Sequence, residues 1–176
     1  NLYNSKRYEE VIRNGNTLIK KFPNQIIFYN AVSLSLSAID KHEEGLVILR
    51  KAINLYPNNI HVINNIGLLN QKLNQIDNAR EYFSKALSIN NNFIDALVNL
   101  GNLELSEKNF DRSETLLNKA IEISKSKETD EVINMALGNF YQQTGKFKKA
   151  MENFKAINKL NPKNTSADKS ISLIHK

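Results

Sequence analysis

The feature that most constrains the fold of this chain is an internal repeat of 34 residues. Pro23 and Pro57 lie one period apart, each after an amphipathic run. One further period leads to Asn91, in the segment ALSINNNF, which resembles the earlier AINLYPNNI. Pro162 follows two periods and three residues later, and the three extra residues fit the polar stretch 124–130. Periods of roughly 20–50 residues are typical of chains in which small supersecondary units stack side by side.

Alignment of the units shows that small residues recur at fixed positions. A first small position holds Ser33, Gly67, Gly101 and Gly138, and a second holds Val11, Gly45, Ala79, Ser113 and Ala150. Apolar residues recur three and four positions apart within each half-unit, which predicts amphipathic helices with turns at 40–41, 73–74, 108–109 and 144–145. One helix pair cannot bury its apolar stripe alone, so the pairs are expected to stack, with Ala86 and Ala120 where helices approach closely.

This pattern resembles the tetratricopeptide repeat, most clearly in NNIGLLNQKLNQIDNAREYFSKALSINN and LGNFYQQTGKFKKAMENFKAINKLNP. The resemblance extends over nearly the whole chain and implies an all-α, right-handed α-solenoid of helix-turn-helix repeats. It implies one continuous domain, with a partial first repeat at 1–25, repeats at 26–59, 60–93, 94–130 and 131–164, and a C-terminal helix at 165–176. The sequence departs from the family at the aromatic residue that opens the repeat, which is Tyr29 once and then Ile63, Leu97 and Asn134.

The two ends do not read as complete repeats. Residues 1–4 are expected to be the tail of a first helix and residues 8–22 the second helix of that pair, which exposes a face that an upstream helix would cover. Residues 165–176 are expected to form a helix that caps the fifth unit. The alternative for this segment is the first helix of a sixth repeat.

Composition excludes several classes of protein. Cysteine is absent, which rules out a disulfide framework and a thiolate zinc site. No stretch approaches the roughly 18–20 uninterrupted apolar residues of a membrane span, and no signal peptide opens the sequence. We therefore expect no membrane insertion and a cytoplasmic location.

Catalysis is not expected. Among the three histidines, His42 falls where other units place packed side chains, His61 falls on the predicted groove, and His175 is expected to be solvated. The sequence supplies no nucleophile with an oxyanion site, no metal-ligand set and no phosphate-binding glycine loop. We predict a non-catalytic chain that uses no cofactor and no metal.

The resemblance implies a peptide-binding groove on the first helix of each pair. The groove residues that it implies are Asn30, Leu34, His61, Asn64, Asn65, Leu68, Lys72, Asp95, Asn99, Asn102, Met135, Asn139 and Gln142. These positions carry one lysine against one aspartate, although the chain has a net charge of +6. A nucleic-acid site needs a basic stripe, and the two-carboxylate clamp of some family members needs Lys and Arg, so neither partner is expected.

Amides dominate the predicted groove. Asn99 and Asn102 in NLGN, and Asn139 in LGN, resemble the asparagine ladder in the tetratricopeptide region of the O-linked N-acetylglucosamine transferases, which implies contacts to an extended peptide backbone. The competing interpretation is that asparagine is compositional filler. The leading hypothesis is a module that binds an extended protein segment. The alternatives are a recruiting region of a larger enzyme, such as a glycosyltransferase or sulfotransferase, and a spacer that self-associates through exposed terminal faces.

Overall fold

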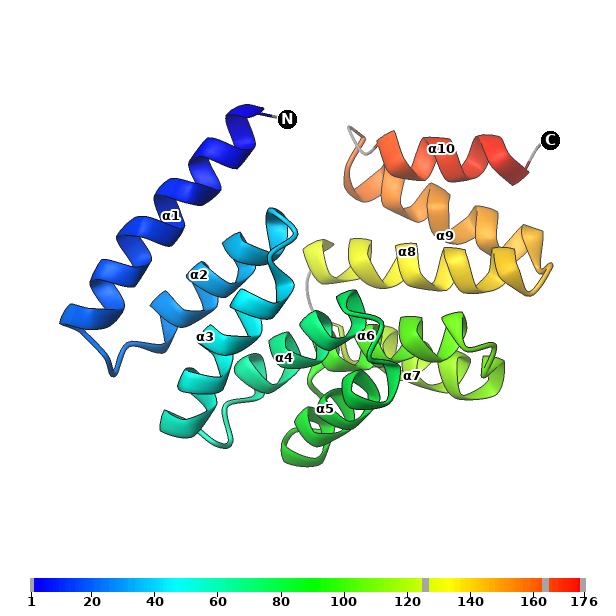
Figure 1. Cartoon of the computed structure of the whole chain (residues 1–176). Coiled ribbons are helices and arrows are strands. Elements are labelled where there is room, and N and C mark those ends of the chain that lie inside the picture. The colour runs from blue at the N-terminus through cyan, green and yellow to red at the C-terminus, as the bar shows by residue number, and fades with distance from the viewer. Residues whose placement is uncertain (1, 125–126, 163–164, 175–176) are drawn as a thin grey trace. The chain divides into compact units, whose positions relative to one another are not determined.

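The computed structural model describes residues 2–124, 127–162 and 165–174, with side chains considered outside 2–5 and 127–129. His175 therefore lies outside the described residues. Within this part of the chain the regular structure is entirely helical, which confirms the predicted all-α class (Figure 1). The helices are α1 (Leu2–Lys21), α2 (Ile26–Ala38), α3 (His42–Leu55), α4 (Ile60–Lys72), α5 (Ile76–Ile89), α6 (Ile94–Ser106), α7 (Phe110–Ile123), α8 (Lys127–Gln143), α9 (Phe147–Leu160) and α10 (Thr165–Ile174).

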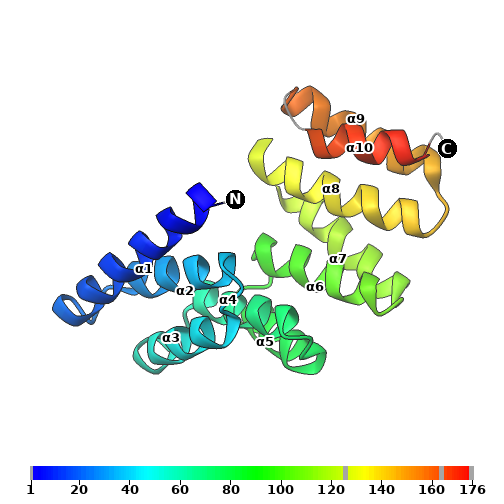
Figure 2. The same ribbon diagram turned by 45° about the horizontal axis from the view of Figure 1, so that its top comes forward.

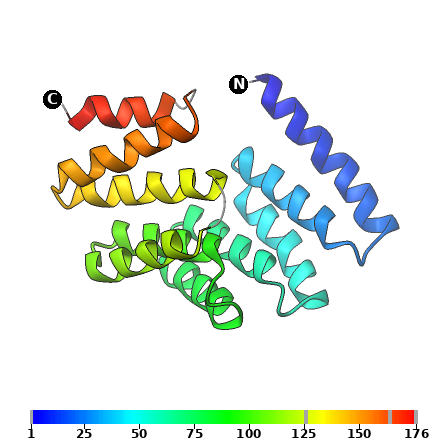
Figure 3. The same ribbon diagram turned by 180° about the vertical axis from the view of Figure 1, so that it is seen from behind.

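The helices form two compact units, each described here by itself. Unit 1 comprises Asn1–Asn91, with α1 to α5, and unit 2 comprises Asn92–Lys176, with α6 to α10. Within each unit every helix packs on its neighbour in sequence, and the first helices of successive pairs also touch, α2 with α4 and α6 with α8. In unit 2, α8 lies between α7 and α9, and α10 lies along α9 (Figure 2). In unit 1, α1 packs along α2 (Figure 3).

The turns that join the two helices of a pair have one geometry. Each contains a residue in the left-handed region, with φ of 61° at Asp40, 58° at Asn74, 61° at Lys108 and 71° at Gly145. The next backbone N–H then donates to the carbonyl five residues back, as from Lys41 to Leu36 at 2.9 Å and from Lys146 to Tyr141 at 2.8 Å. This arrangement satisfies carbonyls at the helix end and reverses the chain sharply, so the four turns lie where the sequence predicts them.

Small residues let the two helices of a pair approach closely. A Cβ added at Gly67 of α4 would lie 2.6 Å from Cε1 of Phe83 in α5, and one at Gly138 of α8 would clash with Phe154 of α9. Both phenylalanine rings are fully buried, so the glycines provide the space that the rings fill. Ala86 and Ala120 are also fully buried, as the repeat register predicts.

The N-terminal prediction is wrong in one respect. The sequence pattern predicts a break between residues 4 and 8, whereas α1 runs unbroken from Leu2 to Lys21. Lys6 occupies the position that corresponds to Asp40, Asn74 and Lys108, all of which have positive φ. A left-handed conformation costs a residue with a side chain about 1–2 kcal/mol, and a helix that continues through Lys6 avoids that cost.

The segment that contains the three-residue insertion forms a longer helix than its counterparts. Helix α8 has 17 residues, whereas α2, α4 and α6 have 13 each. It begins about one helical turn before residue 131, where the register places the start of the repeat. The extra residues are therefore accommodated ahead of the repeat, and the register of the following positions is preserved.

Candidate functional site

The predicted groove residues all lie on the first helices of their pairs, α2 and α4 in unit 1 and α6 and α8 in unit 2. The opposite sides of these helices carry the apolar residues that pack against the second helices, which leaves the polar positions toward solvent. The exposed members are Leu34, His61, Lys72, Asp95 and Asn139, and the half-buried members are Asn30, Asn65, Leu68, Asn99, Asn102, Met135 and Gln142. Asn64 differs from the rest, because it is only 4% exposed.

In unit 1 two predicted groove amides bond to each other. Nδ2 of Asn65 in α4 donates to Oδ1 of Asn30 in α2 at 3.2 Å. An asparagine side chain has one acceptor oxygen and two donor hydrogens, so this bond uses part of the capacity that a ligand would need. The pair joins neighbouring first helices, and it gives these asparagines a structural role beside any role in binding.

In unit 2 two amides at another repeat position, Asn102 and Asn139, line open pockets. A pocket of about 300 Å³, the apolar pocket, is lined by Asn102, Glu131, Val132, Met135, Ala136, Asn139 and Ser166. A second pocket of about 280 Å³, the amide pocket, is lined by Asn102, Leu105, Ser106, Asn139, Gln142 and Gln143. Asn102 and Asn139 belong to both linings, so they stand where the two pockets adjoin. The structure thus brings together four predicted residues, Asn102, Met135, Asn139 and Gln142.

Two lining residues of the apolar pocket, Glu131 and Ser166, lie outside the repeat positions that the family resemblance assigns to the groove. Glu131 lies one position before the groove positions of α8, and Ser166 belongs to α10. A signal for Ser166 exists in the sequence, because one 34-residue step from Val132 leads to it. Helix α10 therefore carries the register of a first helix and forms a wall of the pocket, in addition to covering α9.

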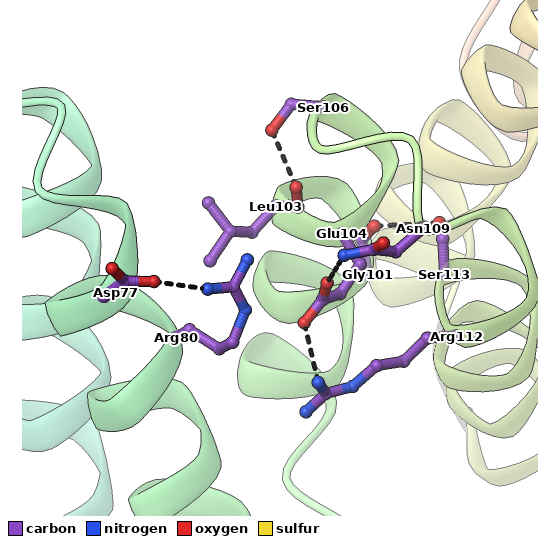
Figure 4. A network of polar contacts seen from close by, with 9 residues as sticks. All are labelled: Asp77, Arg80, Gly101, Leu103, Glu104, Ser106, Asn109, Arg112 and Ser113. Atoms are coloured by element: carbon purple, nitrogen blue, oxygen red, sulfur yellow. Dashed lines mark hydrogen bonds and ion pairs between the residues drawn. The ribbon is translucent and has the colours of Figure 1, made fainter.

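A buried carboxylate in α6 was also missed. The side chain of Glu104 is fully buried, with Arg112 Nη1 at 3.1 Å from Oε1 and Asn109 Nδ2 at 2.7 Å from Oε2 (Figure 4). Ser113 Oγ adds a bond of 2.8 Å to the carbonyl of Gly101. These contacts tie the start of α7 to α6 and compensate the buried charge, so Glu104 serves the turn rather than a reaction.

Tyr141 occupies the position in α8 that Glu104 occupies in α6. Burial raises the pKa of its hydroxyl above the usual value, and the charge and hydrogen bond of Glu114 raise the pKa further. The ammonium groups of Lys146 and Lys149 lie 5.7 and 5.1 Å from the ring centroid, and Lys146 also lies 3.5 Å from Glu114. A phenol held neutral in this way is a hydrogen-bond donor and not a general base.

His42 has local partners. Its Nδ1 lies 3.3 Å from Oγ of Ser37, and its Nε2 lies 3.8 Å from the carboxylate of Asp40. The side chain is 15% exposed, as expected for a packed ring at the start of a helix.

The described residues offer neither a cluster of metal ligands nor a membrane-spanning helix. Among those residues, His, Asp and Glu side chains nowhere gather in a group of three or more that could hold a metal ion. Over the same residues, each helix is too short or too polar to cross a membrane.

Comparison with known proteins was made by family model and by structure. Residues 71–127 and 133–164, together about half of the chain, match family models described as tetratricopeptide repeat. No curated protein sequence matches the chain.

Several solved structures share the fold at low sequence identity. A chain of the APC/C hetero-tetramer Cut9–Hcn1 is 14% identical, with a TM-score of 0.86 over 97% of this chain and 34% of that one. TTC0263, a thermophilic TPR protein of Thermus thermophilus, is 14% identical, with a TM-score of 0.84 over 98% and 93% of the two chains. YrrB, described as a TPR protein with an unusual peptide-binding site, is 20% identical, with a TM-score of 0.59 over 92% and 81%. The chain spans about a third of the matched Cut9–Hcn1 chain, and these likenesses confirm the predicted α-solenoid fold.

Proposed function

We propose that this chain, which belongs to the tetratricopeptide repeat family, binds an extended segment of a partner protein along the first helices of unit 2. Repeats of this family are typical of protein–protein interaction modules. In this proposal the chain itself is non-catalytic and recruits its partner by binding alone. The cytoplasmic location expected from the sequence stays a prediction.

The observation that carries the proposal is the placement of Asn102 and Asn139 between the two pockets of unit 2. Each amide can accept from a peptide N–H and donate to a peptide carbonyl, so it suits a backbone of any sequence. Packed helices lie about 8–10 Å apart, which is close to the span of three residues of extended chain, at about 3.3–3.6 Å per residue. Amides on α6 and α8 therefore have the spacing to meet regularly placed backbone groups.

The proposal assigns a smaller part to unit 1. Asn65 is among the predicted groove residues, and its bond to Asn30 competes with any ligand. Asn99 is half-buried and belongs to neither described pocket lining. Peptide contact by amides is thus concentrated on Asn102 and Asn139, and the likeness to the O-linked N-acetylglucosamine transferase ladder stays a hypothesis.

The test compares one pair of groove amides from each unit. Peptides are selected from a display library against the whole chain, and their affinities are measured by fluorescence anisotropy. The double variant Asn102→Ala/Asn139→Ala should bind them about tenfold more weakly or worse, because each lost hydrogen bond is worth about 0.5–1.5 kcal/mol and about 1.4 kcal/mol is a factor of ten. The matched control Asn30→Ala/Asn65→Ala should retain wild-type affinity. Unchanged affinity in the unit 2 variant would leave asparagine as compositional filler.

Self-association is the second candidate function. Val11 of α1 is 40% exposed, although the corresponding Ala79, Ser113 and Ala150 are fully buried. Leu173 of α10 is 62% exposed. Light scattering over a concentration series distinguishes this candidate, because a self-associating spacer gains mass with concentration and a monomeric peptide receptor does not.

A recruiting region of a larger enzyme would use the same surface. Its support is that the matched chain of the Cut9–Hcn1 assembly is about three times as long as this one, so arrays of this kind occur within longer chains. The open reading frame that encodes this sequence would decide between a free module and an enzyme region.

A further inference from the structure

We infer that the apolar pocket of unit 2 selects partner segments in which a large apolar side chain stands beside a lysine or arginine. This inference rests on the proposed function and adds a sequence preference to it. The apolar side chain enters the pocket between α8 and α10, and the basic side chain meets Glu131 on the pocket wall.

The size and lining of the pocket suit an apolar side chain. Its wall includes Val132, Met135 and Ala136, and Val132 is 56% exposed although it is aliphatic. The volume of about 300 Å³ is roughly twice that of an engineered cavity of ~150 Å³ that holds a benzene ring. Methionine adapts its shape to different occupants, so Leu, Met or Phe of a partner could each fill this space.

The charge of the lining suits a cation. Of the described residues that line the apolar and amide pockets, Glu131 alone carries a formal charge. Its carboxylate oxygens each lie 3.4 Å from Nδ2 of Asn161, which is long for a hydrogen bond. An ammonium or guanidinium group typically approaches a carboxylate to about 2.7–2.9 Å and bonds roughly twice as strongly as a neutral donor. A basic side chain of the partner would add a charge-assisted contact to those that Glu131 already makes.

A second carboxylate extends the acidic character of this face. Asp95 of α6 is exposed and occupies the same repeat position as Val132 of α8 and Ser166 of α10. The groove positions of α6 and α8 include no lysine, arginine or histidine. The carboxylates would repel a partner segment that carries acidic residues beside the apolar pocket, which lowers its affinity. They would attract a segment that carries basic residues there, so the charge separates the two kinds of partner.

The experiment selects random ten-residue peptides from a display library on the whole chain. We expect the enriched peptides to share a Leu, Met or Phe that lies within two positions of a Lys or Arg. One enriched peptide is then synthesised with Lys, Gln or Glu at the basic position. We expect the Lys form to bind about tenfold more tightly than the Glu form. The variant Glu131→Gln should remove this preference, and Glu131→Lys should reverse it.

Two matched controls keep the test specific. Glu152→Lys makes the same charge change on an exposed residue of α9 and should leave the Lys preference intact. Val132→Ser should weaken peptides that carry the apolar residue, whereas Ile27→Ser, at the same repeat position of unit 1 and 64% exposed, should not. Circular dichroism of each variant checks that the helices are retained.

The outcomes separate the inference from the proposed function. The inference is overturned if the enriched peptides share no basic residue. It is also overturned if the variant Glu131→Lys still prefers the Lys form of the peptide. In that case the proposed function still stands if Asn102→Ala/Asn139→Ala weakens the same peptides. A selection that enriches no peptide overturns both.

Discussion

Unit 1 and unit 2 share their framework and differ in what they present to a partner. In both, a left-handed residue turns the chain between paired helices, and a glycine faces a buried phenylalanine, Gly67 with Phe83 and Gly138 with Phe154. On the first helices, unit 1 places a bonded amide pair and unit 2 places two amides on open pockets. The comparison teaches that the positions at which helices meet are repeated, whereas the positions that face a ligand are free to diverge.

The charge of the groove positions also differs between unit 1 and unit 2. The groove positions of unit 1 carry His61 and Lys72, whereas those of unit 2 carry Asp95, with Glu131 beside them. The net charge of +6 therefore says little about the partner of unit 2, because the basic residues that produce it lie elsewhere. Four sets of variants test how far the framework is shared and where it differs.

The largest effect is expected where a side chain is added against a buried ring. Gly67→Leu and Gly138→Leu should each lower the free energy of unfolding by about 3 kcal/mol, because the phenylalanine cannot withdraw from a packed interior. Urea denaturation measures both. The control is Gly145→Ala, where an added Cβ meets nothing within 4 Å and only the positive φ costs about 1 kcal/mol. A large cost in one unit alone would mean that the framework is not shared.

A somewhat smaller effect is expected at the second contact between helices. Ala86→Leu in unit 1 and Ala120→Leu in unit 2 should each cost about 1–3 kcal/mol, since both alanines are fully buried and overpacking forces neighbours to move. Denaturant melts of the two variants should give similar midpoints. A neutral Ala86→Leu would show that the repeat register assigned to unit 1 is wrong.

A stabilising effect of about 1 kcal/mol is expected from Ser33→Ala. Ser33 is fully buried, and its Oγ has no hydrogen-bond partner, whereas unit 2 has glycine at the corresponding positions. Removing the hydroxyl removes its desolvation cost. Thermal melting would contradict this explanation if the midpoint of Ser33→Ala fell below that of the wild type.

The smallest effect is expected at the turns. Lys108 adopts a φ of 61°, and the corresponding turn residue of the next helix pair in unit 2 is Gly145, with a φ of 71°. Lys108→Gly should therefore stabilise the chain by about 0.5 kcal/mol, the gain from relieved strain being partly offset by a more flexible unfolded state. Asn74→Gly in unit 1 should gain less, because asparagine tolerates the left-handed region. Chemical denaturation of the two variants side by side measures the difference.

The parts of the structure that sequence predicts are those set by local periodicity. The turns at Asp40, Asn74 and Lys108 and the helix contacts at Gly67 and Ala86 follow from positions repeated every 34 residues. The unbroken α1 was missed, because the pattern alone does not show that a turn needs a packed helix before it. The bond between Asn65 and Asn30 was missed for another reason, since side chains on different helices pair through conformations that spacing does not specify.

The residues of the candidate site likewise include some that could be predicted from the sequence and some that could not. The resemblance to the tetratricopeptide family, applied through the repeat register, implied that Asn102, Met135, Asn139 and Gln142 lie on the groove. The structure gathers these four residues around two pockets. Glu131 was overlooked because it precedes the positions that the family uses. Ser166 was overlooked because α10 was interpreted mainly as a cap, although the register continues into it.

The packing of each helix on its sequence neighbours has a consequence for the order of events during synthesis. Among the described residues, helices pack within their units on partners no more than two helices away, so contacts join residues that are close in sequence. Helices form in about a microsecond or less, whereas a ribosome adds roughly 5–20 residues per second. Each pair can therefore complete its interior seconds before the next one leaves the ribosome. Only the apolar stripe of the most recently formed helix pair is uncovered at any moment. The nascent chain therefore exposes little apolar surface that could aggregate.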